Sequence, residues 1–167
     1  MSIAARKLLS GGLGFGLTFL SAQGSGSDLS SYSFTGISAG QEDTNRIIIV
    51  CAVGRLSSGT GSITGITIGG NAATQIVATS SNQNIGAIYA LSVPTGATVD
   101  VVVTPSAAAV RMAISVYALY GKSAVTAHAS SSQLNLAGSS AITADTEVNG
   151  VAVCLILDLG TTSRTST

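Results

Sequence analysis

Residues 85–104 read IGAIYALSVPTGATVDVVVT and place a turn between two segments of β character. Residues 85–92 and 98–104 are rich in Val, Ile and Tyr, the residue types that favour strands. Between them, Pro94 presets the φ of a turn and Gly96 can adopt a positive φ. We expect two consecutive antiparallel strands joined by a tight turn, which indicates an all-β fold.

The same alternation of β-type runs and turn residues recurs along the chain. Further strands are expected at residues 32–38, 46–53, 62–68, 73–79, 110–119, 124–130 and 150–157. Segments 47–53 and 151–157 are apolar on both faces, which is typical of central strands. Segment 60–68 alternates polar and apolar residues, which predicts one exposed face. The predicted fold is an antiparallel β-sandwich, of immunoglobulin-like or jelly-roll type, with an extended N-terminal arm.

Two stretches near the C-terminus lack a strand pattern. Residues 130–149 are rich in Ser, Asn, Gly and Ala, and they predict a long loop. Residues 161–167 form a polar tail. A sandwich that ends in this way would gain from one more edge strand, and a neighbouring subunit could supply it.

The 167-residue chain is neutral and sparsely charged, with seven Lys and Arg against seven Asp and Glu and 8% charged residues. A nucleic-acid-binding protein needs a basic surface, which this balance excludes. The 46% hydrophobic content argues against disorder, and the length fits one folded domain. An exterior of Ser, Thr and Gly suits a subunit that is packed in an assembly.

The first 27 residues differ in character from the rest. A basic pair at 6–7 precedes the apolar stretch 8–22, an order similar to that of a secretory signal. The stretch is too short and too rich in Gly for a membrane span. We therefore expect an arm over residues 1–27, linked through residues 23–27 to a domain over residues 28–167. The residues expected to dock this arm on a neighbour are Leu13, Phe15, Leu17, Phe19 and Leu20.

This interpretation of the N-terminus makes a prediction about truncation. Removal of residues 2–22 is expected to abolish assembly and to leave the domain folded. The alternative interpretation is that these residues are the signal of a secreted or cell-surface protein.

Residues 36–40, GISAG, match the G-x-S-x-G pattern of a serine hydrolase. Asp100 and His128 follow in the order of acid and base. The hydrolase geometry requires a helix directly after the Ser, whereas residues 41–45 lead into a strand. We therefore expect no enzymatic activity.

Cys51 and Cys154 lie in apolar strand segments, where buried thiols are the favoured interpretation and a bridge across the sandwich remains an alternative. Their spacing does not suit a zinc site. The acidic residues at 42–43 and 145–147 do not form a complete calcium loop. We expect neither a metal nor a cofactor.

Three stretches resemble β-sandwich domains of tailed-bacteriophage and prophage virion proteins. They are ITIGGNAAT at 66–74, IYALSVPTG at 88–96 with the strand that follows it, and SVYALYG at 115–121. The resemblance implies a non-enzymatic structural protein located in the virion, as a capsid decoration or a component of tail or fibre. Its implied partners are other capsid or tail proteins, further copies of itself and a host-surface glycan. The alternative is a carbohydrate-binding adhesin of a cell surface.

Overall fold

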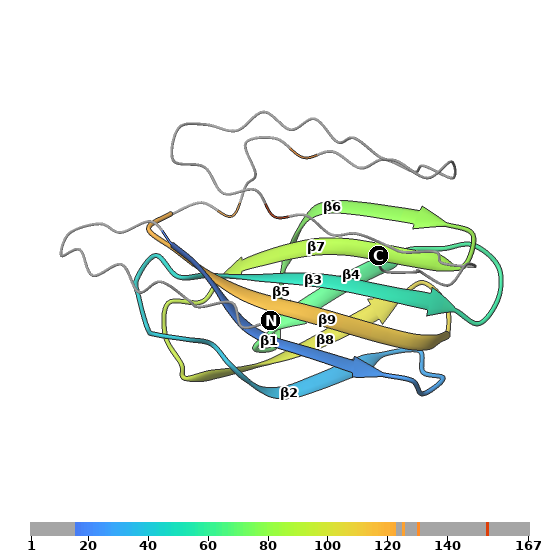
Figure 1. Ribbon diagram of the computed structural model, residues 1–167, viewed down its shortest axis with the longest axis horizontal. Coiled ribbons are helices and arrows are strands. Elements are labelled where there is room, and N and C mark those ends of the chain that lie inside the picture. Colours follow the sequence, from blue (N-terminus) through green and yellow to red (C-terminus); the bar gives the residue numbers. More distant parts are fainter. Residues whose placement is uncertain (1–15, 123–124, 126–129, 131–152, 154–167) are drawn as a thin grey trace, which may run out of the picture.

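The computed structural model describes residues 16–122, 125, 130 and 153, which form an all-β domain without a helix (Figure 1). The strands are β1 (Gly16–Ser25), β2 (Tyr32–Ser38), β3 (Ile47–Leu56), β4 (Ile63–Ile68), β5 (Asn71–Ala72), β6 (Thr74–Ser81), β7 (Asn84–Ser92), β8 (Thr98–Pro105) and β9 (Ala109–Tyr120). All strand pairs are antiparallel. The predicted fold class is confirmed.

The strands form two sheets whose order identifies a jelly roll. One sheet has the order β1-β9-β3-β7-β6 and the other β2-β8-β4-β5, and Figure 1 shows the first running from β6 at the top to β1. The pairs β1·β9, β2·β8, β3·β7 and β4·β5 are nested, as in one long hairpin rolled up. This is the jelly-roll topology, with β6 added beside β7. The topology decides between the two sandwich types that the sequence leaves open.

The main core lies between the two sheets and is built by alternate residues of each strand. Its fully buried side chains include Ile48, Val50, Ile85, Val101 and Val116. Strand β3 is central, between β9 and β7, and all its residues from Ile47 to Ala52 are buried. Strand β4 buries only Ile63, Ile66 and Ile68 and leaves Thr64 exposed. Both polarity predictions are confirmed for these strands.

Two connections differ from the sequence expectation. The turn at residues 93–96 joins β7 in one sheet to β8 in the other, so it crosses between the layers and is not a hairpin. The strand expected at 73–79 is β6, and a two-residue strand, β5, precedes it in the other sheet, where a turn was expected. A tight hairpin at Gly69 and Gly70, whose φ angles of 57° and 79° favour glycine, joins β4 to β5. Turn chemistry was predicted correctly at residues 93–96, but it does not specify which sheet the next strand enters.

The second half of the expected arm belongs to the folded domain. Residues Gly16–Ser25 form β1, which pairs with β9 from Gly16 opposite Tyr120 to Ser25 opposite Met112. A deletion of residues 2–22 would therefore remove most of an edge strand, and the expectation that it leaves the domain intact is corrected. The first half of the arm, residues 1–15, lies outside the described residues.

Several other expectations also fall outside the described part of the chain. They are the strands expected at 124–130 and 150–157, the loop between them and the tail at 161–167. Of these segments, only Val125, Ser130 and Val153 are described. Cys154 and His128 are among the residues that are not described.

Candidate interaction surface

The larger sheet has a second apolar surface on the side away from the main core. We call it the outer face. Its buried members are Ile47, Ile49, Cys51, Ile88 and Ala90, and Ile76, Val77, Tyr117, Leu119, Val125 and Val153 pack around them. A two-layer sandwich ordinarily exposes a polar surface at this position. Two described residues that follow β9 in the sequence, Val125 and Val153, thus cover part of the outer face.

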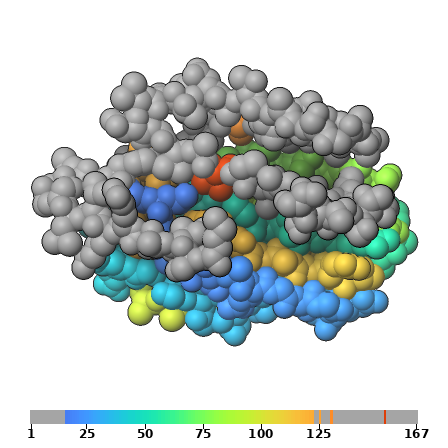
Figure 2. All heavy atoms as spheres, in the orientation of Figure 1, coloured from blue at the N-terminus to red at the C-terminus, as the bar shows by residue number. Residues whose placement is uncertain are grey.

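The outer face extends onto the edge strand β1, where its cover is incomplete. Leu17 lies opposite Leu119 and Phe19 lies opposite Tyr117 in the β1·β9 register. Residues directly opposite one another on neighbouring strands share a face, so Leu17 and Phe19 continue the outer face. Leu17 is 36% exposed and Phe19 is 58% exposed. Figure 2 shows β1 in blue and β9 in orange side by side on the visible surface.

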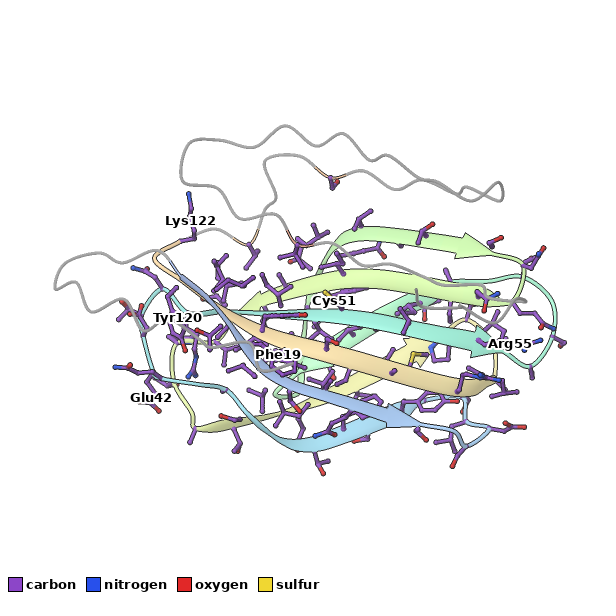
Figure 3. The ribbon with its side chains drawn as sticks, viewed as in Figure 1. Phe19, Glu42, Cys51, Arg55, Tyr120 and Lys122 are labelled. Atoms are coloured by element: carbon purple, nitrogen blue, oxygen red, sulfur yellow. The ribbon has the colours of Figure 1, made fainter. Side chains whose placement is uncertain are left out.

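An aromatic pair holds the Phe19 ring in place. The ring centroids of Phe19 and Tyr117 are 5.5 Å apart, with an angle of 66° between the planes. This edge-to-face geometry contributes about 0.5–1.5 kcal/mol beyond burial. Figure 3 shows Phe19 on β1, away from Glu42 in the loop before β3 and from Arg55 near the end of β3. Phe19 is therefore an ordered apolar side chain that presents more than half of its surface to solvent.

The structure divides the five residues that were expected to dock the arm. Leu17 and Phe19 form the exposed patch on β1, which we call the β1 patch. Leu20 lies at the register shift between Phe19 and Ser21 and packs against the main core. Leu13 and Phe15 lie outside the described residues. Docking on a neighbour stays a prediction for these residues, and the inward position of Leu20 was not predicted.

A buried arginine holds together the loops at one end of the sandwich. Arg46 is fully buried at the start of β3. Its Nε donates to the Val93 carbonyl at 2.6 Å, its Nη1 to Gly40 and Gln41 at 3.2 and 3.0 Å, and its Nη2 to Thr95 and Gly96 at 2.8 Å each. All five N–H donors of the guanidinium are thus used, and all five acceptors are backbone oxygens. Arg46 joins the loop before β3 to the crossover between the sheets.

Two carboxylates in the loop before β3 also accept hydrogen bonds from backbone amides. Glu42 Oε1 accepts a hydrogen bond from the Gly96 N–H at 2.7 Å, and Asp43 Oδ1 accepts one from the Asn45 N–H at 2.7 Å. Both carboxylates therefore organise backbone. Within the described residues no group of three or more His, Cys, Asp or Glu side chains is placed to hold a metal ion.

The G-x-S-x-G motif does not adopt the geometry of a nucleophile. Ser38 is the last residue of β2, and the chain continues through a loop into β3 without a helix. The Ser38 hydroxyl accepts a hydrogen bond from the Gly40 N–H at 3.3 Å, and the Asp100 carboxylate accepts one from Gly36 at 2.8 Å. Both side chains therefore accept hydrogen bonds from backbone amides in β2 or just after it.

One tyrosine of the core is perturbed by burial. Tyr89 donates a hydrogen bond to Gln75 Oε1 at 2.8 Å. Desolvation by burial raises the pKa of Tyr89 above its ordinary value of 10.0. The group lies between the sheets, away from the β1 patch.

No helix capable of crossing a membrane occurs among the residues that the structure describes. Comparison with protein families, with curated proteins and with solved structures finds no match to this chain.

Proposed function

We propose that this protein is a non-enzymatic structural subunit of a bacteriophage virion, either a capsid decoration protein or a component of tail or fibre. The observation that carries the proposal is the β1 patch. Leu17 and Phe19 are two of the three large hydrophobic side chains exposed in the described chain, and they lie together on one strand. Apolar side chains gathered in this way mark an interaction site.

The fold and the charge distribution support the same function. Jelly rolls recur in viral capsid proteins, where they act as rigid building blocks. The described residues include Asp28, Glu42, Asp43, Asp100, Arg46, Arg55, Arg111 and Lys122 as their charged side chains. Strand β1 contains none of them, so contacts through this strand are made without desolvating a charge. In the proposal, β1 and the residues that precede it attach the subunit to its neighbours.

The first test asks whether the protein is part of a particle. Particles are purified from a culture of a strain that encodes the chain, and their proteins are digested with trypsin. The peptide MAISVYALYGK, residues 112–122, is expected in the particle fraction. Its presence only in the membrane or culture supernatant would contradict the proposal.

A second test addresses the attachment surface with point variants, because deletion of residues 2–22 would damage β1. The double variant Leu17→Ser, Phe19→Ser is expected to reduce the copies per particle at least tenfold. Leu29→Ser is the matched control, since Leu29 is 42% exposed but lies outside β1. Equal incorporation of the double variant and the control would exclude the β1 patch as the attachment surface.

Carbohydrate binding is the second candidate function, because jelly rolls also occur in lectins and the exposed Phe19 ring could pack against a sugar. Binding of the protein to a glycan array, lost in Phe19→Ala, would favour this function. Binding that is unchanged in Phe19→Ala would place any glycan site elsewhere.

A further inference from the structure

We infer that two copies of this chain pair through β1, in antiparallel orientation, so that their larger sheets become one continuous sheet. The inference rests on the assembly function proposed above and names the partner as a second copy. An edge strand has backbone N–H and C=O groups that can pair with another strand, and proteins usually protect such edges. Among the described strands, four lie at the edges of the sheets, and they differ in how they are protected.

Three of the edges are short, interrupted or polar. Strand β5 has only two residues. Strand β2 has a register shift between Phe34 and Ile37, and a carboxylate from β8 binds the Gly36 amide there. Strand β6 also has a register shift, and its exposed residues Thr74, Gln75 and Ser80 are polar.

Strand β1 is the least protected edge. It has ten residues, GLTFLSAQGS, with no charge and no proline. Its register shift comes after Phe19, so the segment with the exposed apolar side chains pairs regularly with β9. Among the described residues, β1 has β9 as its only strand partner. These are the properties of a strand that adds to another strand.

The absence of charge on β1 favours a second copy as the partner. When a strand pairs with itself around a two-fold axis, any charge near the axis meets its own copy and is repelled. Strand β1 has no such charge, and the whole chain has a net charge of zero. Two copies can therefore approach without long-range repulsion.

The β1 patch also selects a register. With the two-fold axis at Thr18, Leu17 of each copy lies opposite Phe19 of the other, and the two Thr18 residues face each other. A two-fold axis at Phe19 would instead place Leu17 opposite Ser21. Only the register at Thr18 brings the four exposed apolar side chains together on the outer face, and it adds a favourable Thr–Thr pair on the other side of the sheet.

The experiment measures the mass of the full chain by size-exclusion chromatography with light scattering. The wild type is expected to have twice the chain mass of 16.4 kDa at a concentration of ~100 μM. Thr18→Lys places two like charges opposite each other in the dimer, so we expect a monomer at the same concentration. Ser80→Lys is the matched control, since it adds the same charge to an exposed hydroxyl position on β6. It is expected to remain a dimer.

A cysteine variant tests whether the two Thr18 positions are opposed. It also keeps the inference testable if Thr18→Lys does not fold. Oxidised Thr18→Cys is expected to form a covalent dimer, because directly opposed residues lie about 4.5–5.5 Å apart between Cα atoms. Ser80→Cys is the control and should stay at the mass of the unlinked chain under denaturing conditions.

Three outcomes would overturn the inference: a monomeric wild type, a dimer that persists in Thr18→Lys, or the absence of a cross-link in Thr18→Cys. Dimer formation and presence in particles are independent measurements. A monomer found in particles would refute the pairing alone, and a dimer that never enters particles would refute the proposed function alone.

Discussion

The hydrogen bonds of Arg46 lead to a quantitative prediction about stability. Arg46→Met keeps an unbranched side chain at a buried position but removes all five donors that hold the loops at 40–41 and 93–96. Five carbonyl oxygens then lose their partner at once. A hydrogen bond to a charged group contributes about 1.5–3 kcal/mol.

The total effect is smaller than five such contributions, because loop carbonyls can move slightly and bind water. Removal of one partner from a buried ionic interaction costs about 3–5 kcal/mol. We therefore expect Arg46→Met to lower the free energy of unfolding by about 4 kcal/mol. Arg46→Lys keeps three donors, so its loss should be intermediate.

Urea unfolding followed by circular dichroism measures this effect. With a slope of ~2 kcal/mol per M, a loss of 4 kcal/mol lowers the midpoint by ~2 M. Arg55→Met, near the far end of β3, is the control, since Arg55 is exposed and binds only Gln83 Oε1, at 3.1 and 3.0 Å. We expect a loss below ~1 kcal/mol for Arg55→Met. A similarly small loss for Arg46→Met would refute the view that Arg46 holds the two loops together.

Three further predictions concern single substitutions in the strands. Gly54→Ala should lose about 1–3 kcal/mol in urea unfolding, because its new Cβ would lie 2.7 Å from Met112 Cε and 3.0 Å from a backbone oxygen. Gly65→Ala should gain about 0.4–1 kcal/mol by the same measurement, since no atom lies within 4 Å of its Cβ position and its φ is not positive. The raised pKa of Tyr89 means that the folded state holds the phenol proton more tightly than the unfolded state, so this stabilisation is complete below pH ~10 and is lost as pH rises through the raised pKa. Tyr89→Phe should therefore flatten the decline of unfolding free energy above pH ~10, and an unchanged decline would assign it to other groups.

Local sequence patterns were sufficient to predict most strands and their polarity. Segment 47–53 was recognised as central because both of its faces are apolar, and β3 has neighbours on both sides. The jelly-roll order was not predictable, because it depends on pairs such as Gly16 with Tyr120 that are far apart in the sequence. Strand β1 was missed because its Gly and Ser residues are typical of linkers, and its register shift interrupts the alternation of faces.

The exposed apolar residues of β1 were predicted as docking residues, whereas the hydrogen bonds from Arg46 to two loops were not predicted. Leu17 and Phe19 stood out as apolar residues in a segment without charge, and the structure exposes both. Arg46 was visible in the sequence as a charge directly before a buried strand. Its partners are backbone carbonyls of two separate loops, and no pattern of side chains encodes such an arrangement.

The nested strand pairs also determine when this protein can fold during its synthesis. Strand β1 leaves the ribosome first among the described strands, but its partner β9 is the last of them. At ~5–20 residues per second, the interval between the two is about 5 to 20 s. Such long-range pairing is intrinsically slow, and strands without partners are prone to aggregate. The strand that we propose to join two finished copies is thus exposed on every nascent chain, and crowding of nascent chains on one messenger RNA favours premature pairing between them.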